Sequence, residues 1–149
     1  MGELHASWTE EIDAPIERVW EIAADVPDSP RWQPSLEKVE VRETDAAGRA
    51  TLVDTEADAK VKTTKQTLRF AYDEPTGMSW EQERGDVKSL VGSWTFVELG
   101  PGRTKATYEL RVDPGRMLGL LLRGPAEGRV KEFLTKGAAE GLKRTAEAG

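Results

Sequence analysis

Apolar and polar residues alternate along most of this chain, beginning with residues 4–12. There Leu4, Ala6, Trp8 and Ile12 fall on one side of the pattern, which Glu10 interrupts. A period of two indicates a β-strand with one buried face. Turn sequences recur roughly every dozen residues after this and separate six more predicted strands. These cover residues 36–44, 49–59, 63–72, 78–84, 87–99 and 105–112, and we expect an antiparallel meander.

Two segments instead follow the helical period. The first begins at Asp13 and Pro15, residues that favour the start of a helix, and ends in the proline-bounded turn 27–34. The second lies near the C-terminus, where one apolar stripe is formed by Val130, Phe133, Leu134, Gly137, Ala138, Gly141 and Leu142. The order of strand, short helix, six strands and long helix predicts an α+β fold in a single domain, residues 1–149.

Gly137 and Gly141 lie on the apolar stripe of the predicted C-terminal helix, where a close-packed helix would carry Leu or Ile. Glycine inside a helix costs about 1 kcal/mol relative to alanine, so its presence here needs a reason. Two explanations are open at this point. The glycines let the helix backbone approach the sheet closely, or they leave room for a ligand.

Composition narrows the class of function. The 149 residues carry a net charge of −6, one histidine and no cysteine. An acidic chain argues against nucleic-acid binding, because neutralising phosphates needs a face rich in Lys and Arg. The lack of cysteine excludes disulfides and thiolate ligands, and His5 falls on the outward side of the first strand. We therefore expect a cytoplasmic protein without a metal site or cofactor, and the sequence leaves the oligomeric state open.

Four features of the chain resemble the START-like, helix-grip proteins of the SRPBCC superfamily, most closely their polyketide cyclase/dehydratase and coenzyme Q-binding branch. They are the segment APIERVWEIAADVPDSPRWQP, the segment GSWTF, the strand GRTKATYEL and the long terminal helix. The resemblance implies a seven-stranded curved antiparallel sheet around the C-terminal helix, with one or two short helices after the first strand. It also implies a deep, largely apolar cavity. Members carry lipids or quinones, cyclise aromatic polyketides, sense hormones or assist chaperones, so the fold limits the ligand class rather than the reaction.

If the alternating faces point into such a cavity, its walls are rich in aromatic side chains with a few polar groups, as small-molecule sites usually are. An inward charge such as Arg84 must be paired, bind a ligand or lie near the rim, and its place at a strand end favours the rim. We also expect Trp32, fixed between Pro30 and Pro34, at the rim or in a lid. The candidate ligand-binding residues are Trp32, Leu68, Phe70, Tyr72, Trp80, Gln82, Arg84, Trp94, Phe96, Tyr108, Leu118, Leu121, Phe133 and Gly137.

The segment 117–122 is apolar on every side, and Arg116 and Arg123 bracket it before Gly124 and Pro125 break the helix. Two interpretations are open. The segment is packed over the cavity mouth and buried throughout, or it is a mobile lid or a patch that makes transient contact with a membrane while an apolar ligand is loaded.

These observations favour the binding or transport of a hydrophobic small molecule, such as a lipid, a quinone or a polycyclic aromatic. One alternative is a polyketide aromatase/cyclase or dehydratase, in which Arg84, Gln82, Tyr108 or a carboxylate would move protons or stabilise an enolate. The other is a protein-interaction module with a filled core. No catalytic constellation decides among them, and GPGR at residues 100–103 is a hairpin turn rather than a phosphate loop.

Overall fold

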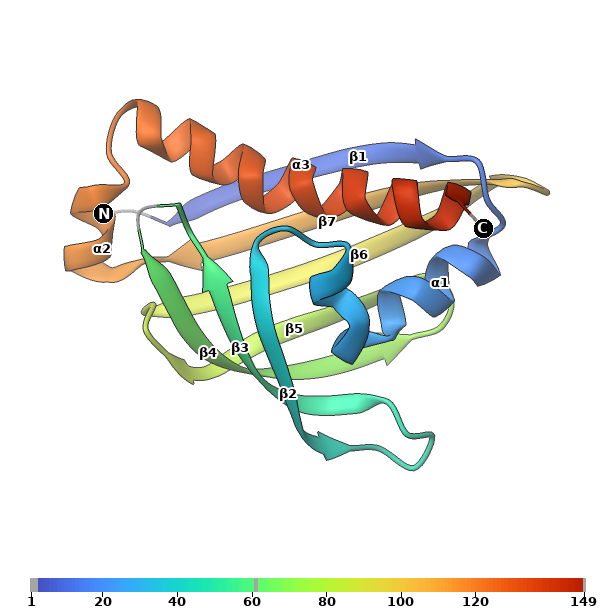
Figure 1. Cartoon of the computed structure of the whole chain (residues 1–149), viewed down its shortest axis with the longest axis horizontal. Helices are drawn as coiled ribbons and strands as arrows, with labels where there is room; N and C mark the ends of the chain where they lie inside the picture. Colours follow the sequence, from blue (N-terminus) through green and yellow to red (C-terminus); the bar gives the residue numbers. More distant parts are fainter. Residues whose placement is uncertain (1–2, 61, 149) are drawn as a thin grey trace.

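One seven-stranded antiparallel sheet organises the computed structural model, which describes residues 3–60 and 62–148 (Figure 1). The strands are β1 (Leu4–Ile12), β2 (Leu36–Thr44), β3 (Ala50–Asp58), β4 (Thr63–Asp73), β5 (Gly77–Gly85), β6 (Ser89–Gly100) and β7 (Arg103–Asp113). They pair in the order β1-β7-β6-β5-β4-β3-β2, so the first strand lies beside the last. All the predicted strands are confirmed, with ends that differ by a residue or two, as strand ends commonly do.

Four helical segments accompany the sheet: α1 (Ile16–Ala24), the 3-10 helix η1 (Val26–Arg31), α2 (Gly115–Leu121) and α3 (Pro125–Ala148). The long helix α3 packs along β1 and β7, while α1 and α2 lie at opposite ends of the molecule (Figure 1). Arg18 ties α1 to the end of α3, because its Nε donates a hydrogen bond to the carbonyl oxygen of Ala146 at 2.7 Å. The α+β helix-grip architecture is therefore confirmed.

Large side chains fill the space between α1 and the sheet. Trp20 of α1 is 1% exposed, and its ring meets the rings of Tyr72 and Phe96 edge-on at centroid distances of 6.2 and 6.3 Å. Val19 and Ile12 are completely buried beside them. Burying a side chain of this size stabilises the fold by about 1.5–3 kcal/mol, so this end of the molecule is a packed core.

The helix α3 approaches the segment after η1 too closely for a side chain to fit between them. A Cβ at Gly141 would lie 1.9 Å from the carbonyl oxygen of Trp32, and one at Gly137 would lie 3.0 Å from Cγ of Pro34. Gly141 therefore serves the close approach of two backbones, and Gly137 serves close packing against the Pro34 ring. Neither leaves room for a ligand.

Two glycines with positive φ flank α2: Gly115 at 82° is its first residue, and Gly124 at 68° lies in the link between α2 and α3. The helical spacing divides the apolar side chains of this segment into two sets. Leu118 and Leu122 face inward, and the outward set is Met117, Leu120 and Leu121. The interpretation that the whole segment is buried is therefore wrong for its outer side.

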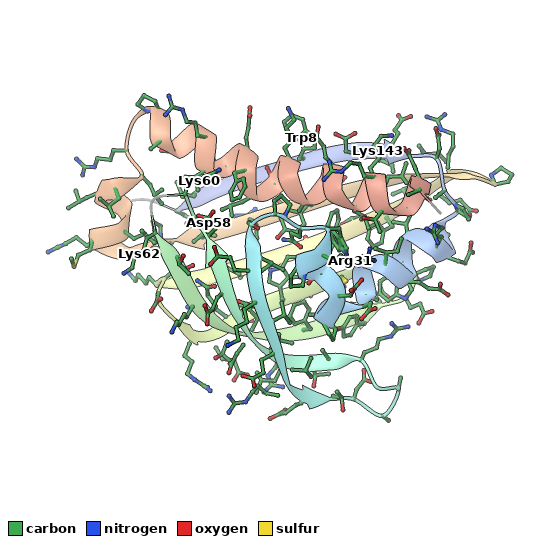
Figure 2. All side chains as sticks on the ribbon, in the orientation of Figure 1. Trp8, Arg31, Asp58, Lys60, Lys62 and Lys143 are labelled. Atoms are coloured by element: carbon green, nitrogen blue, oxygen red, sulfur yellow. The ribbon has the colours of Figure 1, made fainter. Side chains whose placement is uncertain are left out.

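The turn between β3 and β4 lies at the same end of the molecule as α2, and Figure 2 shows the side chains of Lys60 and Lys62 there. Lys60 reaches across to α3, where its Nζ lies 4.1 Å from the ring centroid of Phe133. Contacts of this cation–π kind are worth about 0.5–1 kcal/mol at exposed sites. No helix in the described part of the chain is long and apolar enough to cross a membrane.

Candidate functional site

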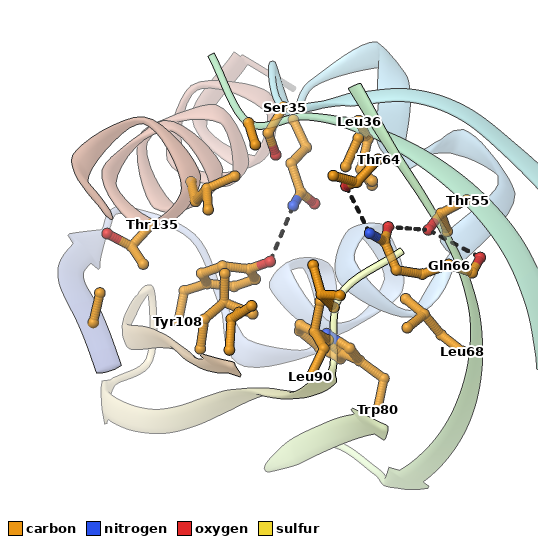
Figure 3. A pocket seen from close by; sticks show the side chains of 18 of the residues that line it. Ser35, Leu36, Thr55, Thr64, Gln66, Leu68, Trp80, Leu90, Tyr108 and Thr135 are labelled. Carbon is orange, nitrogen blue, oxygen red and sulfur yellow. Dashed lines mark hydrogen bonds between the residues drawn. The ribbon is translucent and has the colours of Figure 1, made fainter. Parts of the chain in front are cut away.

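A cavity lies between the sheet and α3 (Figure 3). All seven strands and all four helical segments contribute residues to its walls. The cavity has a volume of about 130 Å³. This is roughly ten times what a single water requires. The lining is mostly apolar, which is typical of a small-molecule site and makes a filled core an unsuitable description of this protein.

Half of the candidate residues line this cavity. They are Trp32, Leu68, Phe70, Trp80, Trp94, Tyr108 and Leu118. The centroid of Trp80 lies 5.5 Å from that of Phe70 on the adjacent strand β4, and 5.6 Å from that of Tyr108, which it reaches across β6. Trp94 continues the row at 4.7 Å from Tyr108. The inward faces of β4 to β7 thus form one aromatic wall, because residues at the same level of adjacent strands meet side by side.

Trp80 lies close against the neighbouring strand because residue 92 has no side chain. Trp80 pairs with Gly92 between β5 and β6, and a Cβ at position 92 would come within 2.3 Å of the indole ring. The indole therefore rests on the backbone of β6, where it forms part of the cavity wall.

Tyr108 and Gln33 form the first polar point of the cavity. Both are buried, and Nε2 of Gln33 donates a hydrogen bond to the Tyr108 hydroxyl oxygen at 3.2 Å (Figure 3). Burial raises the pKa of the Tyr108 phenol well above its ordinary value, although the hydrogen bond from Gln33 acts in the opposite direction. The phenol is therefore neutral at physiological pH, and its own proton can be donated to a ligand.

Thr55, Thr64 and Gln66 form a second polar point on β3 and β4 (Figure 3). Nε2 of Gln66 donates to Oγ1 of Thr64 at 2.6 Å, and the hydroxyl of Thr55 lies 3.4 Å from Oε1 of the same amide. The three side chains are buried and hold one another in place. They bear no charge, so they can orient a neutral polar group of a ligand.

The cavity is nearly free of charge. Lys131 is the only lining residue, among those the structure describes, that is charged at neutral pH. Its Nζ lies 2.8 Å from Oε2 of Glu127, its neighbour one turn away on α3. A charged ligand would lose its hydration here without gaining a free counter-charge, so the site suits a neutral molecule.

Residues 12–136 match the profile of a family described as polyketide cyclase/dehydrase and lipid transport. The chain belongs to this family. A search of curated proteins found no significant match. The match to the family profile confirms the resemblance to START-like proteins.

Solved structures share the fold of this chain over nearly its whole length. A START superfamily protein from Mycobacterium smegmatis is 19% identical, with a TM-score of 0.84 and 99% of each chain covered. A protein from Thermus thermophilus is 22% identical, with a TM-score of 0.82 and 97% of each chain covered. The Zhui aromatase/cyclase from Streptomyces sp. R1128 is 22% identical, with a TM-score of 0.76, and the alignment covers 98% of this chain and 94% of that one. At these identities the likeness shows the fold alone.

Tyr72 and Phe96, two of the candidate residues, lie beneath α1 instead of lining the cavity. Phe96 is 1% exposed between Trp20 and Trp94, and Tyr72 is half-buried with its hydroxyl donating to the carbonyl oxygen of Ala50 at 2.6 Å. Their faces were predicted correctly. The correction concerns their position along the strand, because α1 covers the sheet where they lie.

Arg84 faces away from the cavity because a β-bulge interrupts β5. Thr67 pairs with Arg84 and Leu68 pairs with Gln82, so Glu83 is an extra residue that reverses the alternation beyond it. Arg84 is exposed on the outer face near Asp54, whose pKa is lowered mainly by the hydrogen bond from Thr67, then by Arg42, with a smaller effect from the charge of Arg84. Gln82, just before the bulge, donates to the carbonyl oxygen of Val87 at 2.9 Å and does not line the cavity.

The remaining candidates on the helical segments are also placed elsewhere. Leu121 is 54% exposed on the outer side of α2, and Phe133 lies under Lys60 on the flank of α3. Gly137 contacts Pro34. For Leu121 and Phe133, a step of one residue along the chain leads to an inward neighbour, Leu122 or Leu134.

Trp32 is a buried wall residue rather than a rim or lid residue. It is 6% exposed, its ring centroid lies 6.2 Å from that of Trp94, and its carbonyl group abuts Gly141. Pro34 lies against Gly137 of α3, and the ring of Trp32 is buried instead of being presented to solvent. Its neighbour Gln33 was missed by sequence reasoning, because a polar residue in a proline-rich turn gives no signal of burial.

Proposed function

We propose that this protein binds and carries a neutral hydrophobic small molecule in the cavity between the sheet and α3. The observation that carries the proposal is a mostly apolar cavity, whose one charged side chain in the described lining is already paired, with an aromatic wall that includes the Tyr108 hydroxyl as a proton donor. Apolar walls supply affinity through burial, and a few fixed polar groups supply orientation. Membership of a family whose description includes lipid transport supports the same function.

The arrangement of polar groups narrows the ligand class. Tyr108 can donate to a carbonyl or ether oxygen, and the Thr64–Gln66 pair offers a second neutral point on another wall. A quinone, a lipid with a small uncharged headgroup or a polycyclic aromatic that bears oxygen would satisfy both. A fatty acid anion would not, because Lys131, the one cation in the lining that the structure describes, is already paired with Glu127.

The two tyrosines of the chain provide a matched test. Calorimetric titration would compare 1,4-naphthoquinone with naphthalene on the wild type, on Tyr108→Phe and on Tyr72→Phe. Removing one hydrogen bond is worth about 0.5–1.5 kcal/mol, so Tyr108→Phe should weaken quinone binding by roughly 2- to 12-fold and leave naphthalene binding unchanged. Tyr72→Phe should change neither. If neither compound bound the wild type, the proposed cavity function would be lost.

Native mass spectrometry of freshly purified protein, followed by solvent extraction, would identify the natural ligand. A neutral apolar molecule carried through purification would support carriage. A bound fatty acid anion or nucleotide would contradict the ligand class argued above.

A polyketide aromatase/cyclase or dehydratase is the second candidate function. The neutral phenol of Tyr108 favours it, since a buried proton donor beside an apolar wall could polarise a ketone. The high pKa of the same phenol makes it unsuitable as a general base near neutral pH. An aromatase would convert an open-chain poly-β-ketone into an aromatic ring with the loss of water, whereas a carrier would return the polyketone unchanged.

The proposed partner is a membrane, and the proposed location is the cytoplasm. The ligand is taken up and released during transient contact between the 117–122 segment and a membrane. The absence of cysteine from the sequence supports a cytoplasmic location.

A further inference from the structure

The outer face of α2 exposes three large apolar side chains next to the cavity. Met117 is 83% exposed, Leu120 56% and Leu121 54%. Leu118, on the inner side of the same helix, lines the cavity. A single helical layer therefore separates the proposed ligand from an uncovered apolar surface. We call the three exposed side chains the α2 apolar triplet.

Positive charge surrounds the α2 apolar triplet, although the chain as a whole has a net charge of −6. Residues 58–60, 62, 86–88 and 113–131, which meet at this end of the molecule, include seven Lys and Arg residues against four Asp and Glu. Lys62, Lys88 and Arg116 line a surface hollow that also includes Met117. Arg123 is exposed at the other end of α2.

The helix α2 is also lightly held. None of the residues of α2 itself is buried, and positive-φ glycines lie at its first residue, Gly115, and in the link to α3, Gly124. Segments with few buried contacts open at low free-energy cost. Movement of α2 would uncover the cavity, because Leu118 and the adjoining Leu122 are part of its wall.

We propose that the outer face of α2 docks on an anionic lipid bilayer and that docking opens the cavity to the membrane. The α2 apolar triplet enters the acyl boundary, and Lys62, Lys88, Arg116 and Arg123 contact the lipid headgroups. An apolar centre with cations around it is the pattern of a segment that lies in a membrane interface. The inference rests on the proposed function, since a neutral apolar ligand partitions into bilayers and would be collected there. Because the ligand would be collected from a bilayer, a bilayer is the expected partner of this surface rather than an acidic protein.

Vesicle flotation of the full-length protein tests the docking surface. Vesicles of phosphatidylcholine alone would be compared with vesicles that also contain phosphatidylglycerol. The wild type should float with the anionic vesicles and be released by salt. Met117→Ser/Leu120→Ser/Leu121→Ser should reduce partitioning at least about tenfold, because it removes the apolar anchor. The matched control replaces three apolar residues of β6 that are 43–44% exposed, Val91, Val97 and Leu99, and should float as the wild type does.

Two double variants test the contribution of positive charge to membrane binding. Arg116→Gln/Arg123→Gln should weaken partitioning by about fivefold for each cation removed. Lys105→Gln/Arg144→Gln, at exposed sites away from α2, should have little effect. Equal partitioning of the wild type with neutral and anionic vesicles would overturn the proposal, as would an unchanged triple serine variant. So would capture by an acidic protein without any flotation.

Naphthoquinone titration of the same variants in solution separates docking from ligand binding. Triple serine and double glutamine variants that bind the quinone normally but fail to float would support a distinct docking surface. If no variant and no wild-type protein bound the quinone while flotation persisted, the proposed carrier function would fail and the docking surface would stand.

Discussion

Replacing Gly141 by alanine should destabilise the protein, although alanine is the better helix former. The added Cβ would lie 1.9 Å from the carbonyl oxygen of Trp32, whereas real Cβ atoms essentially never come closer than 3.0 Å to such an atom. Both backbones are buried, so relief requires α3 and the segment after η1 to move apart by roughly 1 Å. Overpacking of this kind costs about 1–3 kcal/mol, and no rotamer change can relieve a contact with backbone.

The expected magnitude combines two opposite effects. Alanine gains about 1 kcal/mol of helix propensity. If the clash lies near the upper end of its range, the net loss is about 2 kcal/mol, and Tm falls by roughly 4–8 °C for a chain of this length. Gly128→Ala is the matched control on the same helix, because a Cβ there meets nothing within 4 Å. It should be neutral or stabilising by up to about 1 kcal/mol.

Urea and thermal unfolding of the two variants beside the wild type would measure the difference. A Gly141→Ala protein as stable as Gly128→Ala would refute the reasoning. It would mean that α3 and Trp32 are not in close contact and that the glycine leaves open space, the explanation rejected above.

Three further predictions concern residues around the cavity. Arg84→Ala should leave naphthoquinone affinity unchanged, because the bulge turns this side chain outward; a tenfold loss in calorimetry would show that the arginine reaches the ligand. Phe96→Ala should cost about 3–5 kcal/mol in urea unfolding, and a cost below 1 kcal/mol would show that the region under α1 is not a packed core. Burial raises the pKa of Tyr72 from 10.0 to about 12, and that of Tyr108 is raised as well. The unfolded chain therefore loses its phenol protons at a lower pH than the folded protein does. The contribution of these groups to the free energy of unfolding should be fully present below pH 10 and should decline as the pH rises toward about 12. Tyrosinate absorbance appearing at pH 10 in folded protein would contradict this.

The sequence predicted the faces of the strands well, because alternation records burial directly. Leu68, Phe70, Trp80, Trp94 and Tyr108 were all expected on inward faces, and all five line the cavity. The number of strands and the long terminal helix were equally accessible, since turn residues and the helical period mark them.

Other features depend on tertiary structure that leaves no local mark. Nothing in the sequence of β5 indicates that Glu83 is an extra residue, so Arg84 was assigned to the wrong face. Whether Phe96 lies under α1 or lines the cavity depends on where α1 packs on the sheet, and sequence periodicity does not indicate this. The segment 117–122 is apolar on every side, so the pattern alone could not show which leucines face the cavity.

The contact between Trp80 and Gly92 has a consequence for the range of ligands that related proteins could accept. Because the indole leans on a strand position without a side chain, residue 92 sets how far Trp80 projects into the cavity, without itself being part of the lining. A methyl group there would push the ring toward the ligand and shorten the space available. Ligand size could thus be tuned during evolution by a substitution behind the wall, while every side chain that touches the ligand kept its identity.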